Sequence, residues 1–255
     1  AIGYGSIKKS DLTGSVGSVK VEEISKNPVT SLDQSLQGRI AGVQVVQTSA
    51  QPGGNTLFRV RGGSSIYSRG EPLYIIDGMQ INSSENLSFL SAPPINALSS
   101  LNPNDIESIE ILKDASATSI YGAKGANGVV LITTKRGMAN TDRVRFEAYY
   151  GIQEIAKKIE VMNATQYAIL YDEAGRNAAE DQGRTYTPTF PDPESLGEGT
   201  DWQENIYRVA PTQNYQLSVS GGTERTQYSL SGNYFNQEGI IIGSDFRRFS
   251  FRSNL

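Results

Sequence analysis

Apolar and polar residues alternate along four segments in the second half of the chain. The segments are residues 143–153, 215–220, 228–234 and 248–252, and each has aromatic residues near an end. Alternation with a period of two is typical of a β-strand with one apolar and one polar face. A membrane-crossing strand of about 10 residues and a strand of a soluble β-sandwich share this pattern, so the alternation alone leaves both open.

The connections between these segments help to separate the two interpretations. A tight turn, Gly221–Arg225, joins the second and third segments, whereas residues 156–212 form a long excursion between the first and second. Short turns on one rim and long loops on the other are typical of outer-membrane β-barrels. The barrel interpretation predicts that one set of apolar side chains contacts lipid hydrocarbon: Val144, Phe146, Tyr215, Leu217, Tyr228, Leu230, Phe249 and Phe251.

The first half has a different pattern, in which short helices and strands follow one another. Residues 106–111 are typical of a strand, Asp114–Ala117 opens a short helix, and residues 129–134 form an apolar, β-branched run suited to a buried strand. Glycines separate the helix from the second strand. A phosphate-binding loop has the opposite order, from strand through glycines to helix, so we expect a tight packing connection here and no nucleotide site.

Other signals extend this first domain towards the N-terminus. Residues 32–40 have helical spacing, with Gly42 ending the helix, and Asp77–Gly78 is a strong hairpin-turn signal. We therefore predict an α+β domain over residues 1–138 and a second region of antiparallel strands over residues 139–255.

Composition excludes several classes of function. The chain has no histidine and no cysteine, so it cannot form a Ser/His/Asp or Cys/His nucleophile pair or an ordinary zinc site. Its net charge of −4 argues against nucleic acid as a partner. We expect no enzyme activity, no cofactor and no metal. Asp192, Glu194, Glu198 and Asp201 could form a cation site, but their spacing fits a solvated loop better.

Three stretches of sequence resemble one known family. LKDASATSIYGAKGANGVVLITTKRG, at residues 112–137, resembles the end of the plug domain in SusC-like TonB-dependent outer-membrane transporters. FRVRGG at 58–63 with PLYIIDG at 72–78 is similar to the family's paired strands, and residues 31–46 are similar to its opening helix and strand. The resemblance implies an α+β plug domain with a mixed β-sheet and short helices, followed by the first antiparallel strands of a large transmembrane β-barrel.

The resemblance also implies a function for the whole transporter. It would import an oligosaccharide or peptide across the outer membrane of a Gram-negative, Bacteroides-like bacterium, driven by TonB. The expected partners are the remainder of its own barrel, a SusD-like surface lipoprotein, TonB, the substrate and outer-membrane lipid. The segment that contacts TonB should lie upstream of the family's VVVGYG start, of which Ala1–Gly5 is present. Four strands are too few to close a barrel, so we expect this chain either to be part of a longer protein or to pair with other chains.

Two groups of candidate functional residues follow from the resemblance. Polar contacts between plug and barrel wall are expected from Arg61, Glu110 and Lys113. The apical loops of the plug should face the substrate through Tyr67, Arg69, Asn82, Asn86 and Phe89. Aromatic rings can stack on sugar faces, and amides can bind hydroxyl groups.

Two rival functions remain open from the sequence. A soluble carbohydrate-binding or adhesion module would bury the apolar faces of the alternating strands against one another. A glycoside hydrolase would need two carboxyl groups about 5 to 10 Å apart, which sequence spacing does not show.

Overall fold

The computed structural model describes most of the chain. The residues it describes are 16–20, 32–47, 49–54, 56–60, 62, 70–81, 98 and 101–255. They belong to two compact units. The first comprises Ala1–Gly151, Pro211–Gly239 and Ser244–Leu255, and the second comprises Ile152–Ala210 and Ile240–Gly243.

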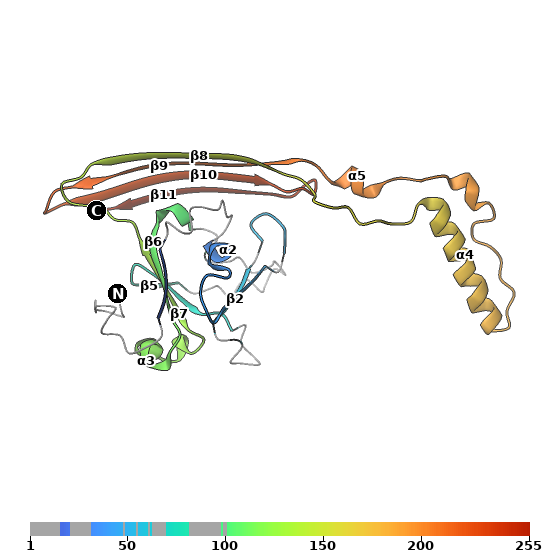
Figure 1. Ribbon diagram of the computed structural model, residues 1–255, viewed down its shortest axis with the longest axis horizontal. Coiled ribbons are helices and arrows are strands. Elements are labelled where there is room, and N and C mark those ends of the chain that lie inside the picture. The colour runs from blue at the N-terminus through green and yellow to red at the C-terminus, as the bar shows by residue number, and fades with distance from the viewer. Residues whose placement is uncertain are drawn as a thin grey trace. The chain divides into compact units, whose positions relative to one another are not determined.

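A five-stranded mixed sheet forms the centre of the N-terminal domain (Figure 1). In spatial order its strands are β1 (Val16–Lys20), β6 (Ile106–Leu112), β7 (Val129–Thr134), β4 (Leu73–Ile76) and β5 (Met79–Ile81). The β4–β7 pair is parallel and the other pairs are antiparallel. This confirms the expected mixed sheet and each of the strands predicted over these residues. The strand β7 is buried at every position but Thr133, and its first four residues are apolar, as expected for a strand covered on both faces.

A helix and a small second sheet complete the apolar core. The helix α2 (Leu32–Leu36) precedes β2 (Val43–Gln47), which pairs antiparallel with β3 (Thr56–Val60). The apolar residues of this part that are buried in the core are Leu32, Leu36, Ile40, Val45, Phe58 and Val60. The helix predicted over residues 32–40 ends earlier, at Leu36, because Gly38 takes a positive φ of 71° that a helix does not allow.

The glycine-rich connection between β6 and β7 is a packing element, as predicted. It consists of α3 (Ala115–Thr118) and the 3₁₀ segment η5 (Ser119–Gly125). Gly128 then enters β7 with a φ of 94°, and a β-carbon there would lie 3.0 Å from the Val60 side chain. Only glycine fits this position without strain, because both the conformation and the space exclude a side chain.

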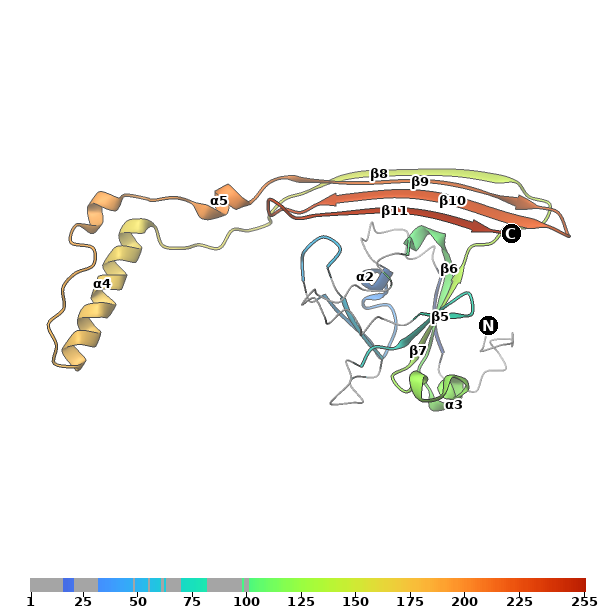
Figure 2. The ribbon, with the colours of Figure 1, turned by 180° about the vertical axis from the view of Figure 1, so that it is seen from behind.

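The four alternating segments form one antiparallel sheet, seen from two sides in Figures 1 and 2. Its strands, in spatial order, are β11 (Asp245–Asn254), β10 (Gln227–Glu238), β9 (Ala210–Gly222) and β8 (Arg143–Gln153). The register pairs Tyr234 with Tyr215 on one face and Ser231 with Ser218 on the other. The apolar and polar residues that alternate in the sequence therefore lie on opposite faces of the sheet, as predicted.

The two faces of this sheet differ in character. Gln216, Asn233 and Arg248 are buried on one face, whereas Val144 and Phe249 on the other are 74% and 78% exposed. The residues predicted to contact hydrocarbon all belong to the second face and are exposed, except for Tyr228, which is half-buried. A closed sandwich would bury these side chains against one another, and in the described part of the chain they are not buried.

The second unit contains the long excursion between β8 and β9. Its helices are α4 (Ala164–Asp181), the 3₁₀ turn η6 (Pro193–Leu196) and α5 (Trp202–Ile206). Asn163 caps α4 in a reciprocal capping box with Gln166. The helix ends at Asp181, shortly before Gly183, whose φ is 63°. None of the helices in the described residues is both long enough and apolar enough to cross a membrane.

Candidate functional site

Asp77, in the N-terminal domain, contacts the polar face of the four-stranded sheet. Asp77 and Gly78 both have positive φ, 48° and 87°, and form the tight β4–β5 turn. The Asp77 carboxylate accepts hydrogen bonds from the backbone N–H of Thr134 at 3.0 Å and from its hydroxyl at 2.7 Å. The Arg252 guanidinium of β11 forms an ion pair with Asp77 and donates to the Thr134 hydroxyl at 2.8 Å.

This ion pair is well shielded from water. The Arg252 and Asp77 side chains are 25% and 18% exposed, and they are separated by 175 residues in the sequence. Charge-assisted hydrogen bonds of this kind are stronger than neutral ones. The contact therefore joins the tip of a hairpin, the end of β7 and the strand β11 at one point.

A buried amide network forms a second contact. The Asn102 side chain caps the 3₁₀ turn η4 (Pro103–Asp105) and donates to the Gln216 Oε1 atom at 3.1 Å. The Gln216 Nε2 group in turn donates to the Asp105 carboxylate at 3.1 Å. All three side chains are buried. Because the Gln216 amide uses both its donor and its acceptor, this contact is specific in orientation.

Two further contacts come from β11. Arg248 donates to the Leu101 carbonyl at 3.1 Å, and its guanidinium lies 5.3 Å from the centre of the Phe235 ring on the neighbouring strand. The Asn254 side chain donates to the Lys135 carbonyl at 3.3 Å. The N-terminal domain is therefore held to β9 and β11 by polar groups.

The connection between the two sheets also lies close against the β9–β10 turn. Asn140 donates its backbone N–H to the Gly222 carbonyl at 2.8 Å. A β-carbon on Gly137 would lie 2.5 Å from the Gly221 carbonyl oxygen, so only glycine fits. The Tyr228 hydroxyl donates to Asp142 at 3.1 Å, which explains why this tyrosine is less exposed than its neighbours on the apolar face.

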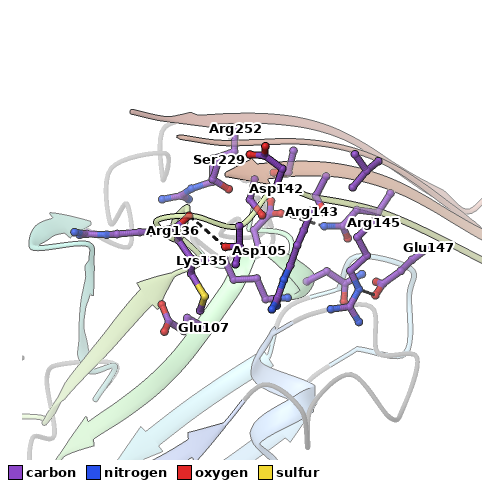
Figure 3. A pocket seen from close by; sticks show the side chains of 18 of the residues that line it. Asp105, Glu107, Lys135, Arg136, Asp142, Arg143, Arg145, Glu147, Ser229 and Arg252 are labelled. Atoms are coloured by element: carbon purple, nitrogen blue, oxygen red, sulfur yellow. Dashed lines mark hydrogen bonds and ion pairs between the residues drawn. The ribbon is translucent and has the colours of Figure 1, made fainter. Parts of the chain in front are cut away.

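A cavity of about 920 Å³ lies beside these contacts (Figure 3). It is lined by the beginning of β6, the connection from Lys135 to Asp142, residues of β8, β9 and β10, and Arg252 of β11. Burial lowers the pKa of the Lys135 ammonium group, and the nearby Arg145 lowers it further. The lining combines charged side chains of both signs with apolar ones such as Met138 and Val144.

The structure describes two of the predicted site residues. Glu110 is half-buried in β6, and the Lys113 ammonium group donates to the Ala41 carbonyl within the N-terminal domain. Contacts of these two residues with a barrel wall remain a prediction. The other predicted residues, which lie outside the described part of the chain, are Arg61, Tyr67, Arg69, Asn82, Asn86 and Phe89.

The residues that do join the two sheets were not predicted. Asp77 was interpreted only as a turn residue. Gln216, Arg248 and Arg252 occupy polar positions of alternating strands, which is the one signal the sequence carries for them. Alternation identifies the face of a residue and gives no information about its partner across the domain boundary.

Carboxylates in the second unit stabilise its loops. Asp172 of α4 accepts hydrogen bonds from the Tyr186 hydroxyl at 2.6 Å, from Thr189 N–H at 2.9 Å and from Phe190 N–H at 3.0 Å. The Tyr186 hydrogen bond, and then the two backbone bonds, hold the Asp172 pKa below its ordinary value.

Asp201, one of the four acidic residues considered as a cation site, instead caps a helix. Asp201 caps α5 by accepting the Glu204 N–H at 3.0 Å, and it also faces Lys158. The Glu204 N–H, and then Lys158, lower the pKa of Asp201. Among the residues that the structure describes, no group of three acidic, histidine or cysteine side chains could hold a metal ion.

Comparisons with known proteins agree with this architecture. The family model of the TonB-dependent Receptor Plug Domain matches residues 8–129. Over the whole chain, the sequence is 43% identical to TonB-dependent receptor P26 of Formosa agariphila and 37% identical to TonB-dependent receptor SusC of Bacteroides thetaiotaomicron. The chain spans 24% of the length of each of these relatives.

A solved structure is also similar to the whole of this chain. The RagAB peptide importer in its open-open state matches 100% of this chain with a TM-score of 0.80 and 33% sequence identity. The match covers 30% of the importer chain. The likeness therefore includes both the mixed sheet and the antiparallel strands.

Proposed function

Since the chain belongs to the TonB-dependent receptors and carries their plug domain, we propose that it supplies the plug and first barrel strands of an energy-coupled nutrient importer of the outer membrane. Residues 1–138 are the plug in this proposal, and residues 139–255 begin the barrel. The observation that carries the proposal is the division of the four-stranded sheet into an exposed apolar face and a polar face bound to the plug.

The apolar face fits lipid. Phe146, Leu217 and Phe251 are all more than half exposed, and burying such side chains in hydrocarbon is favourable by about 25 cal/mol per Å². Outer-membrane strands alternate in this way, with apolar residues towards lipid and polar residues towards the lumen.

The polar face fits a plug that must close the pore and later move. Hydrogen bonds between plug and wall can exchange with water when the plug shifts, so each contributes only about 0.5–1.5 kcal/mol to the closed state. An apolar interface of the same size would resist separation more strongly. Arg61, Glu110 and Lys113 are further candidates for contacts with the rest of the wall.

The expected partners combine the names of the relatives with the sequence resemblance. The RagAB peptide importer favours a peptide as substrate, and the TonB-dependent receptors favour TonB as the source of force. An oligosaccharide as the other substrate class and a SusD-like surface lipoprotein as the lid are proposed from the resemblance of the sequence motifs. Tyr67, Arg69, Asn82, Asn86 and Phe89 are candidates to face the substrate. No bond in the substrate is made or broken, so no catalytic residue is assigned.

Uptake by whole cells tests this function. Cells carrying the full-length protein are incubated with panels of fluorescent oligosaccharides and fluorescent peptides, with and without TonB. We expect at least one compound to accumulate only when both the receptor and TonB are present.

Fractionation supplies the decisive control. The full-length protein should remain with the outer membrane after a high-salt wash and require detergent for release. Release into detergent-free buffer, without TonB-dependent uptake of any compound, would favour the soluble adhesion module instead.

A further inference from the structure

The second unit, Ile152–Ala210 with Ile240–Gly243, has almost no apolar interior. The structure describes all of its residues, and three of them are buried: Ala168, Asp172 and Ala210. None of the three has a large apolar side chain. Ordering a chain costs conformational entropy, which folded domains offset mainly by burying apolar side chains. The unit on its own therefore lacks the usual source of stability for a fold.

Large apolar side chains are present in this unit, but they lie on its surface. Ile159 and Trp202 are 73% and 72% exposed, and Val161, Val209 and Ile242 are each more than half exposed. Single exposed apolar residues are ordinary on proteins, whereas contiguous ones mark contact surfaces.

On α4 the exposed apolar side chains form a continuous stripe. Tyr167, Leu170, Tyr171, Ala174 and Ala178 follow helical spacing and therefore share one face of the helix. All five are exposed, and none is charged. We call these five residues the α4 stripe.

The face of α4 next to the stripe is covered by the chain that returns alongside the helix (Figures 1 and 2). A β-carbon on Gly175 would lie 2.5 Å from the Tyr186 ring, and Asp172 accepts hydrogen bonds from Tyr186, Thr189 and Phe190. The Phe190 ring also lies 5.7 Å from the Tyr171 ring. The returning chain thus covers one border of the α4 stripe and leaves the rest of it exposed.

A neighbouring connection of the sheet already packs on this unit. The strand β9 begins at the edge of the sheet where β10 ends and β11 begins. Tyr207 forms a β-bridge with Ile241 of the β10–β11 connection, and the Ile242 N–H donates to the Ile206 carbonyl at 3.0 Å. The second unit is therefore built from two connections that leave the same edge of one sheet.

Further connections at this edge are expected in a longer receptor. The chain spans 24% of the length of the P26 and SusC relatives, and in a barrel each later pair of strands adds one connection to the edge with the long loops. A segment of the same chain is always present and acts at high effective concentration. A separate protein would leave a unit without an apolar core uncovered whenever it dissociates.

From these observations we infer that the α4 stripe is covered by apolar segments of the receptor's own later loops, which leave the same edge of the barrel. The loop between β8 and β9 then folds together with those loops, as the β10–β11 connection already does with its last residues. This inference rests on the part of the proposed function in which the barrel continues beyond β11.

Photo-crosslinking in the full-length receptor identifies what lies on the α4 stripe. p-Benzoylphenylalanine replaces Leu170 on the stripe or, as the matched control, Glu173, which is exposed on another face of the same helix. Outer membranes that contain each variant are irradiated, and the adducts are separated by mass and mapped as peptides. We expect the probe at position 170 to form an adduct with a peptide of the receptor that follows Leu255, and the probe at position 173 to form none.

Hydrogen exchange measures the same cover without a bulky probe. In the purified full-length receptor, with no other protein present, Leu170→Ala should accelerate exchange of the α4 amides about tenfold, equivalent to about 1.4 kcal/mol, because part of a buried leucine is lost. An uncovered helix would not show this acceleration, since alanine has the higher helix propensity. Glu173→Ala is the control and should not accelerate exchange.

Four results would overturn the inference: an adduct of position 170 with a separate protein, equal adduct yields at the two positions, no adduct at position 170, or exchange that Leu170→Ala does not accelerate. Uptake by the parent receptor is measured on the same cells. TonB-dependent uptake alongside any of these results leaves the importer standing and rejects only the cover. An adduct within the chain, in cells without TonB-dependent uptake, rejects the importer and supports the cover.

Discussion

The core of the plug domain and its interface with the four-stranded sheet differ in chemical character. Ile106, Ile109 and Ile111 of β6 are fully buried among other apolar side chains. The interface a few residues away consists of amides, carboxylates and guanidinium groups. The difference teaches that the plug is suited to move as a folded body, because its interior is held by apolar burial and its attachment by exchangeable hydrogen bonds.

The largest effect is expected from a cavity in the plug core. Ile109→Ala should lower the free energy of unfolding of the plug by about 2–5 kcal/mol, since the site is fully buried. Hydrogen exchange of β6 and β7 amides in the detergent-solubilised receptor measures the loss of protection. The control is Ile120→Ala, whose side chain is 51% exposed. Equal losses in the two variants would contradict the apolar core as the source of plug stability.

A smaller effect is expected at the interface. Arg252→Ala leaves the shielded Asp77 carboxylate without its cation and should weaken attachment by about 1–3 kcal/mol. The expected result is a leak in conductance recordings and faster exchange of the Thr134 amide, while the β6 amides remain protected. The matched control, Arg247→Ala, removes an exposed ion pair with Asp245 that contributes less than about 1 kcal/mol. Loss of β6 protection in Arg252→Ala would show that attachment and plug folding are not separate.

The smallest effect is expected in the second unit, where one carboxylate holds a loop. Asp172→Asn removes one of the two acceptor oxygens, so the Thr189 and Phe190 amides should exchange faster while the plug is unaffected. Glu173→Gln, at an exposed neighbouring position, is the control. Unchanged protection at both amides would contradict the role of the carboxylate.

The same carboxylate predicts a pH dependence. Because the Asp172 pKa is lowered in the folded loop, its stabilisation is fully present above the ordinary carboxyl value of about 3.9 and is lost as pH falls through the lowered pKa. Protection of Thr189 and Phe190 should therefore persist at neutral pH and disappear only in strong acid.

Local patterns predicted the elements well and their partners poorly. Alternation located β8 to β11, and the Asp-Gly turn located the β4–β5 hairpin, because both depend on neighbouring residues. The helix α2 was predicted too long, because apolar spacing continues past Gly38 while the backbone leaves the helix there.

Local patterns could not predict the contact between Asp77 and Arg252. The two residues are 175 positions apart in the sequence, and their contact depends on the tertiary packing of a hairpin turn against a strand. Sequence resemblance predicted a plug domain followed by antiparallel strands, and the structure has both. Its expectation that Arg61, Glu110 and Lys113 contact a barrel wall stays a prediction, and it did not point to Asp77, Gln216, Arg248 or Arg252. A motif shared by a family reports its common fold more directly than the pairing of individual side chains.

The turn residue Asp77 also limits how the sequence can change. Asparagine or glycine would satisfy its left-handed backbone, but neither would balance the positive charge of Arg252. Glutamate would carry the charge on a side chain less suited to that backbone. Substitutions at these two distant positions should therefore occur together among descendants of this gene, as compensating pairs.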